Sequence, residues 1–163
     1  MGYKNILIPL DGSELAEKAL KHVVPIAEPG ATLHILSLVI DDNSILTSMA
    51  LSGTYGGFVA EKMPTSPSIP HLISEREHYL SEVTRPLQEK GYKVIIDARR
   101  GEVVQSIIEL ARDGYDAILM ATHGRTGLSK ALLGSVAQSV VVKSPCPVIL
   151  IPAHSVDEPS TSP

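Results

Sequence analysis

The chain has 163 residues, of which 44% are hydrophobic and only 4% are aromatic. Lysine and arginine total 14 against 18 acidic residues, and the net charge of −4 argues against broad electrostatic binding to nucleic acid or to an anionic membrane. The length and composition predict one globular domain with an aliphatic core, because the chain can bury such a core without disulfides.

The first predicted strand is Asn5–Leu10, a continuous apolar run. Pro9 cannot donate to a ladder of hydrogen bonds, which suits the last residues of a strand. A turn follows at Asp11, Gly12 and Ser13, and either Asp11 or Ser13 can cap the helix that comes next.

That next helix is predicted over Leu15–Ala27, because apolar residues recur there at helical spacing. Pro29 and Gly30 are expected to end it. Thr32–Ile40 is the second predicted strand, since its residues are again almost all apolar.

A long connection follows at residues 41–70, rich in glycine, proline, serine and threonine. Connections of this length are usually functional or mobile, so we expect a flexible insertion within the domain. Ser44–Leu51 has the pattern of a short helix. From the sequence alone, a solvated insertion and a lid over a ligand both remain open.

The second half of the chain continues the alternation. Helical periodicity predicts a helix over Leu72–Lys90, which Pro86 is expected to kink or shorten. Lys93–Ala98 is the third predicted strand, Glu102–Arg112 the next helix and Tyr115–Ala121 the fourth strand.

The last elements are a helix from Ser135 to about Lys143 and a fifth strand, Val148–Ile151. Residues 153–163 are polar and proline-rich, and we predict a disordered tail. The domain itself is therefore expected to span residues 1–152.

Strictly alternating strands and helices predict a single-domain α/β fold, a doubly wound, five-stranded parallel sheet with helices on both faces. In the strand order 3-2-1-4-5, the topological switch point lies between the first and fourth strands, where such sheets bind ligands. Pro9–Asp11 and Met120–Gly124 end those two strands. We therefore expect these distant segments to meet in one crevice.

The segment after the fourth strand carries the strongest functional pattern. Thr122–Gly127 is a glycine-containing loop, and Gly134 and Ser135 open the following helix, with Gln138 placed to complete a capping box. Free N–H groups at a helix start suit a phosphate. The segment is neither a Walker loop nor a dinucleotide fingerprint, and Ser135 acting only as a cap is the structural alternative.

On these residues the chain resembles the nucleotide-binding universal stress proteins, over about residues 3–152. The opening ILIPLDGS, the THGRTG loop and the terminal PCPVILIP match that family. Its ATP signature is glycine, two residues, glycine, nine residues, then glycine and serine or threonine, and Gly124, Gly134 and Ser135 fit it. Ala121 stands where the first glycine falls, so a Cβ lies where the family has none.

The resemblance implies a Rossmann-like fold of the adenine nucleotide alpha hydrolase type and a role for each matching position. Asp11 is similar to the acid near the ribose and phosphates. Pro9 and Leu10 would line the adenine side through their backbone. Leu38 or Val39, at the end of the second strand, would pack on the adenine ring.

The same resemblance assigns the other side of the site. Met120 and Ala121 would offer backbone groups and an apolar wall, and His123, Gly124 and Arg125 would border the phosphate chain. From the last helix, further N–H donors and a hydroxyl would come from Gly134, Ser135 and Val136. The implied ligand is ATP, with a divalent cation such as Mg²⁺ or Mn²⁺ bridging its phosphates in some members.

Each polar group also has a structural alternative. Asp11 can be a helix cap only, His123 can simply bond its loop, and Arg125 can be an exposed loop charge. The other histidines show no metal-ligand spacing, so we assign no protein metal site. No second acidic residue marks an obvious metal pair, so we assign no catalytic residue.

The edge strand and the chain start carry two further expectations. Val148–Ile151 is an apolar strand at a sheet edge, and the resemblance implies that it pairs with a second copy in a homodimer. The chain start lacks a signal-peptide pattern, no apolar run approaches the roughly 20 residues of a membrane span, and Cys146 is the only cysteine. We expect a cytoplasmic protein with no nucleic-acid or membrane partner.

Three functions follow from the sequence. The first is an ATP-binding regulatory or stress-response protein. The second is a slow ATPase that needs a partner, with Asp11, His123 and Arg125 in the catalytic roles. The third is a dimeric interaction protein that binds no nucleotide, for which Ala121 is the only sequence support. The choice between ATP and another adenine nucleotide stays open.

Overall fold

The computed structural model describes residues 2–39, 68–122 and 134–152. The predicted helix Ser44–Leu51, most of the predicted insertion and the predicted tail at 153–163 lie outside these residues. The five strands are β1 (Tyr3–Pro9), β2 (Ala27–Val39), β3 (Lys93–Arg100), β4 (Ala117–Thr122) and β5 (Val148–Pro152). The described helices are α1 (Glu14–Lys21), α2 (Val23–Ile26), α4 (Ile69–Glu89), α5 (Val103–Ala111) and α6 (Ser135–Lys143).

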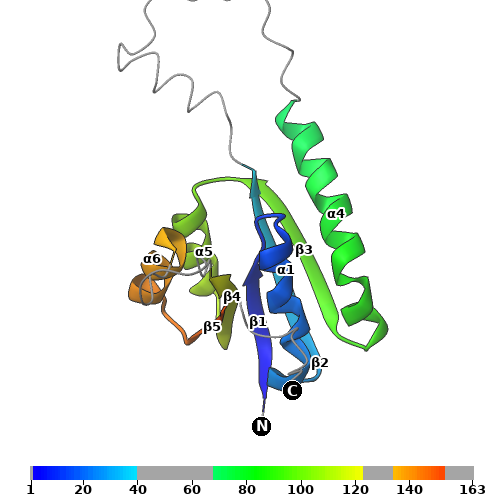
Figure 1. Ribbon diagram of the computed structural model, residues 1–163, viewed down its shortest axis with the longest axis vertical. Helices are drawn as coiled ribbons and strands as arrows, with labels where there is room; N and C mark the ends of the chain where they lie inside the picture. The colour runs from blue at the N-terminus through cyan, green and yellow to red at the C-terminus, as the bar shows by residue number, and fades with distance from the viewer. Residues whose placement is uncertain (1, 40–67, 123–133, 153–163) are drawn as a thin grey trace, which may run out of the picture.

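The strands form one sheet in the order β3-β2-β1-β4-β5, and every neighbouring pair is parallel. Helices α1 and α4 cover one face, while α5 and α6 cover the other (Figure 1). The predicted doubly wound fold and its strand order are confirmed. The switch point falls between β1 and β4, because α1, which follows β1, and α6, which follows β4, pack on opposite faces of the sheet.

Two apolar cores hold these layers together, one on each face of the sheet. Ile6 and Ile8 on β1 point toward α1 and α4, whereas Leu7 between them points toward α5 and α6. All three side chains are fully buried. This explains why β1 is a continuous apolar run rather than an alternating one, since both of its faces are covered.

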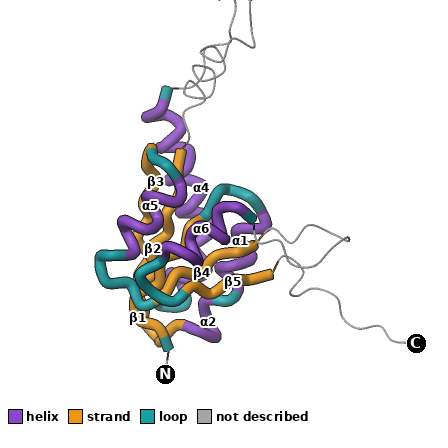
Figure 2. Tube along the Cα trace, turned by 90° about the vertical axis from the view of Figure 1, so that its left-hand side faces the viewer, coloured by secondary structure: helices purple, strands orange, loops and turns teal. Residues whose placement is uncertain are grey.

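The predicted helix Leu15–Ala27 is wrong in its second half. Helix α1 ends at Lys21, α2 is a single turn, and β2 already begins at Ala27, so Pro29 and Gly30 lie inside the strand (Figure 2). Pro25 has no N–H to continue a helix, which accounts for the early end. The register between β1 and β2 slips beside this stretch, between Tyr3 and Asn5, where the extra β2 residues are accommodated.

Helix α4 begins at Ile69, earlier than the predicted Leu72, and runs unbroken through Pro86 to Glu89. The predicted shortening of the helix at this proline is therefore wrong. Pro86 removes only the N–H that would bond to the Glu82 carbonyl oxygen, and the helix continues past this one missing bond. The buried Thr84 hydroxyl donates to the Leu80 carbonyl oxygen over 2.7 Å in the turn before the proline. No helix in the described part of the chain is long and apolar enough to cross a membrane.

Candidate functional site

A cavity of about 950 Å³ lies at the carboxyl ends of β1, β2 and β4, at the switch point of the sheet. Every predicted site residue that the structure describes lines it: Pro9, Leu10, Asp11, Leu38, Val39, Met120, Ala121, Gly134, Ser135 and Val136. The sheet thus brings together three strand ends and one helix start from distant parts of the chain. The other predicted site residues, His123, Gly124 and Arg125, fall outside the described residues.

The β1 end of the cavity is held by hydrogen bonds to β2. The Leu10 N–H donates to the Leu36 carbonyl oxygen over 2.8 Å, and the buried Ser37 hydroxyl donates to the Leu10 carbonyl oxygen over 2.7 Å. The N–H of Leu10 therefore serves the fold. A ligand in this cavity has to use other groups of the β1–α1 turn.

Asp11 and Ser13 together build the start of α1. One Asp11 carboxylate oxygen accepts from the Ser13 N–H over 2.9 Å and from the Ser13 hydroxyl over 2.6 Å. The Ser13 hydroxyl oxygen in turn accepts from the Ala16 N–H over 3.1 Å. Of the two predicted cap candidates, Ser13 is the cap of α1 and Asp11 orients it.

The start of α6 is arranged differently. Gly134, not Ser135, is the N-cap, so the predicted capping box at Ser135 and Gln138 is wrong: the Gln138 N–H bonds to the Gly134 carbonyl oxygen. The Ser135 hydroxyl bonds to none of the described residues, and the first turn of α6 carries no acidic residue. A Cβ built on Gly134 meets nothing within 4 Å, so there is room beside this helix start.

Helix α4 adds a wall that the predicted site residues did not include. Glu75, Arg76 and Tyr79 line the cavity together with Leu72. Arg76 Nη1 donates to the Asp11 carbonyl oxygen over 2.9 Å. The sequence signal for this wall is a charged Arg76 on the same helix face as Leu72 and Tyr79, a face otherwise apolar.

Tyr79 joins α4 to α1. Its hydroxyl donates to a Glu17 carboxylate oxygen over 2.6 Å. Burial, and then the hydrogen bond and the negative charge of Glu17, raise the pKa of the Tyr79 phenol far above its usual value, which the positive charge of Arg76 only partly offsets. The phenol is thus held protonated and donating, and it keeps the two helices in place beside the cavity.

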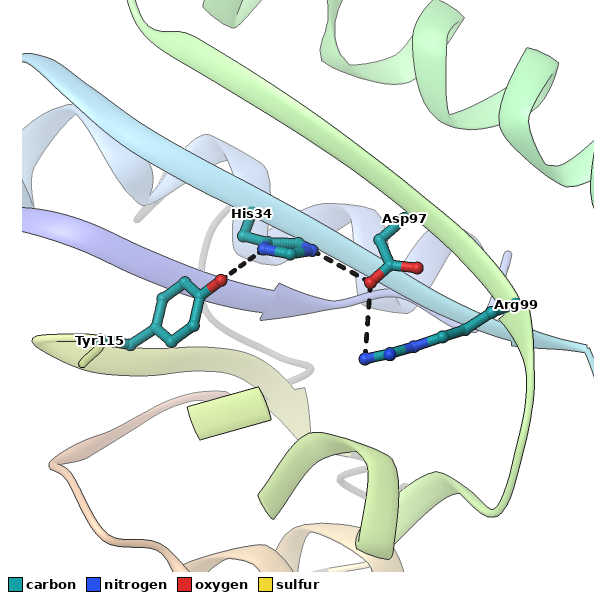
Figure 3. A network of polar contacts seen from close by, with 4 residues as sticks. All are labelled: His34, Asp97, Arg99 and Tyr115. Atoms are coloured by element: carbon teal, nitrogen blue, oxygen red, sulfur yellow. Dashed lines mark hydrogen bonds and ion pairs between the residues drawn. The ribbon is translucent and has the colours of Figure 1, made fainter. Parts of the chain in front are cut away.

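A second polar group of residues lies away from the cavity, on the α5 side of the sheet (Figure 3). His34 on β2 is only 8% exposed, and its ring nitrogens contact the Tyr115 hydroxyl and, over 3.2 Å, an Asp97 carboxylate oxygen. Arg99 lies 3.4 Å from the same carboxylate. Burial, followed by the charges of Asp113 and Asp97, raises the pKa of the Tyr115 phenol. These side chains are partnered among themselves, which indicates a structural role.

The cavity combines an apolar part with polar donors. Leu38, Val39 and Met120 offer aliphatic and thioether surface, while the α6 start and Arg76 offer N–H groups. Such a site suits a ligand with a flat apolar part and an anionic part. No group of three or more potential metal ligands occurs within residues 2–39, 68–122 and 134–152.

Comparison with known proteins points to one family. The model of the universal stress protein family matches residues 2–152. Universal stress protein MJ0577 from Methanocaldococcus jannaschii is 35% identical over 154 residues, covering 91% of this chain and 94% of that protein. The solved structure of MJ0577 superposes with a TM-score of 0.69 at 28% identity, covering 98% of this chain and all of that one.

Two more distant structures share the fold and hold nucleotides. A universal stress protein in complex with cAMP superposes with a TM-score of 0.59 at 18% identity, covering 94% of this chain and 99% of that one. A universal stress protein family protein from Arabidopsis thaliana with AMP bound superposes with a TM-score of 0.55 at 14% identity, and the superposition covers 96% of each chain.

Proposed function

We propose that this chain, which belongs to the universal stress protein family, binds an adenine nucleotide, with ATP as the expected ligand. The observation that carries the proposal is the cavity itself: residues predicted from distant segments line one space at the switch point. Family members with cAMP and AMP bound support the nucleotide class. The role is regulatory, in which the protein holds the nucleotide and reports its presence.

The cavity walls favour one orientation of the nucleotide. The adenine packs on the apolar surface of Leu38, Val39 and Met120, which line the cavity. The phosphates lie at the start of α6, where the N–H groups of Ser135 and Val136 and the Ser135 hydroxyl are available. Asp11 also lines the cavity and is the acid that we expect near the ribose.

A divalent cation would enter with the nucleotide. Asp11 and Glu75 are the described carboxylates that line the cavity, which is too few for a site built by protein ligands alone. Mg²⁺ commonly takes one or two carboxylates and completes its coordination with phosphate oxygens and water. We therefore expect Mg²⁺ or Mn²⁺ to strengthen ATP binding and not to bind measurably without it.

Titration calorimetry and thermal unfolding with ATP, ADP, AMP, cAMP and GTP test the proposal. A ligand at roughly a hundred times its Kd stabilises the folded state by about 2.7 kcal/mol, which is readily seen as a higher Tm. We expect adenine nucleotides to stabilise and GTP to do so less. Absence of binding by every adenine nucleotide would remove the proposal, and phosphate release in the same samples separates holding from hydrolysis.

We also propose a homodimer through β5. This strand lies at the sheet edge and pairs with β4 alone among the described strands, and Val148, Ile149 and Leu150 are only half-buried. An exposed apolar edge strand invites pairing with a second copy. Sedimentation equilibrium at micromolar concentration should give twice the chain mass, and a monomer there would refute the dimer.

A further inference from the structure

We propose that Arg76 of α4 is an anion-binding residue of this cavity, whose guanidinium contacts a phosphate of the bound nucleotide. This inference rests on the proposed function and adds a wall to the site that strand ends and α6 do not supply. Arg76 lines the cavity from the face of the sheet that α1 and α4 cover, opposite the face of α6.

The hydrogen bonding of Arg76 leaves its charge available. Within the described part of the chain, its side chain makes one hydrogen bond, from Nη1 to the Asp11 carbonyl oxygen at 2.9 Å. That acceptor is a neutral carbonyl, and Arg76 forms no ion pair with a described carboxylate. A guanidinium has several further N–H donors and is always charged, and it suits phosphate oxygens in a bidentate arrangement.

The β1–α1 turn is shaped around this guanidinium. Gly12 has a φ of +86°, and a Cβ built there would lie 2.1 Å from Arg76 Nη1. A side chain at Gly12 would therefore occupy the place of the arginine. The adjacent Asp11 carboxylate is directed to Ser13 instead, accepting from both its N–H and its hydroxyl.

Helix α4 is fixed well enough to aim the side chain. Leu80 and Leu87 anchor it in the apolar core, and Tyr79, less than one turn from Arg76, is bonded to Glu17 of α1. A nucleotide whose phosphates sit at the start of α6 would then have a positive charge on the facing wall. The two walls together would grip the anion from both faces of the sheet.

The competing explanation is that Arg76 only ties the β1–α1 turn to α4. The two explanations differ in which ligands respond. A phosphate contact changes the affinity for nucleotides and spares the neutral nucleoside, whereas a distorted turn weakens both. A phosphate contact also depends on the positive charge, so lysine should restore part of what glutamine removes.

The test uses Arg76→Gln, Arg76→Lys and the matched control Arg85→Gln, which removes the same charge from the same helix. Arg85 is 56% exposed, pairs with Glu82 and does not line the cavity. Calorimetry gives the Kd for ATP and AMP, and competition against ATP gives it for adenosine. Thermal unfolding without ligand reports whether each variant is folded.

We expect Arg76→Gln to weaken the affinity for AMP and ATP by about tenfold or more and the affinity for adenosine by less than about twofold. The affinity of Arg76→Lys for AMP and ATP should lie between those of Arg76→Gln and the unmodified protein. Arg85→Gln should match the unmodified protein. Suppose that the unmodified protein binds nucleotide. If Arg76→Gln then binds nucleotide equally well, or loses as much affinity for adenosine as for ATP, the inference is wrong and the proposed function stands. If the unmodified protein binds no adenine nucleotide, both fall.

Discussion

Two helices begin at the crevice between β1 and β4, and they begin in opposite ways. Helix α1 follows β1 with its cap in place: the Ser13 hydroxyl accepts from the Ala16 N–H, and Glu14 and Glu17 stand in the first turn. Helix α6 follows β4 with Gly134 as its cap residue and no acidic residue in its first turn. The start of α1 has a side-chain cap on its Ala16 N–H, whereas the start of α6 has no side-chain cap and is where we propose that the phosphates bind.

The same division holds elsewhere among the described residues. Glu102 caps α5 by accepting from the N–H groups of Val104 and Gln105. His34 of β2 bonds to both Asp97 and Tyr115. No buried side-chain nitrogen or oxygen in the described part of the chain lacks a partner. Most polar groups, including Asp11 and Tyr79 at the cavity, are therefore bonded within the protein, whereas the start of α6 has no side-chain cap. The following changes test this difference.

The largest effect is expected from a carboxylate at the open helix start. Ser135→Glu should lower nucleotide affinity by roughly a hundredfold, about 2.7 kcal/mol, because the new charge repels phosphate. The same charge should leave the free energy of unfolding unchanged or raise it by up to about 1 kcal/mol, since anions stabilise a helix N-terminus. Calorimetry and urea unfolding measure the two quantities.

The control for that change is Val142→Glu, which adds the same charge at the far end of α6. Val142 is 78% exposed and does not line the cavity. Nucleotide affinity should be retained there. An equal loss in both variants would mean that net charge, rather than the open N–H groups, governs binding.

The next effect concerns the turn between β1 and α1, which contains Gly12. Gly12→Ala should cost about 1–2 kcal/mol of unfolding free energy for its left-handed backbone, and the flexible end of Arg76 would have to move aside. Gly114→Ala is the matched control, because Gly114 has a φ of +92° but nothing within 4 Å of its Cβ position. Only Gly12→Ala should also weaken nucleotide binding. Equal affinity in the two variants would contradict the placement of Arg76 in the site.

Two serines then separate capping from binding. Ser13→Ala should lower the free energy of unfolding by about 1 kcal/mol, because it removes the cap of α1. Ser135→Ala should change it by less than about 0.5 kcal/mol, since that hydroxyl caps nothing among the described residues. Nucleotide affinity should fall for Ser135→Ala. The reverse pattern would show that the two helix starts play the opposite roles.

The smallest effect is a pH dependence from Tyr79. The unfolded phenol ionises with a pKa of about 10, whereas the folded pKa is raised, so its contribution is present below about pH 10 and is lost as pH rises above it. Tyr79→Phe should cost about 1 kcal/mol at neutral pH, for the lost bond to Glu17. It should also flatten the alkaline decline of stability, which urea unfolding at several pH values measures. An unchanged slope would refute this role.

Much of the site follows from local patterns, because strand ends in a parallel sheet share one edge. The apolar runs of β1 and β4 are enough to predict that Asp11 and Ala121 lie at that edge, and the alternation of strands and helices predicts the doubly wound sheet. Arg76 and Tyr79 could not be placed in this way. The approach of α4 to the cavity depends on tertiary packing after a long connection, which carries no local pattern.

Other differences have similarly local causes. Pro25 has no N–H for the Lys21 carbonyl oxygen, so the apolar spacing of the predicted helix is divided between α1 and the single turn of α2. Gly134 has a non-helical ψ of 152°, so α6 begins one residue later, at Ser135. Periodicity reflects side-chain character, whereas helix limits depend on backbone donors and on the conformation of single residues.

The central claim is that the N–H groups at the start of α6 hold the phosphates. Amide chemical shifts of labelled protein, recorded while ATP is added, test it residue by residue. We predict saturable shifts of the Ser135 and Val136 amides that adenosine does not reproduce, with the capped Gln105 amide at the start of α5, which does not line this cavity, little changed. Saturating ATP that leaves Ser135 and Val136 unmoved, or moves Gln105 as much, would contradict the account.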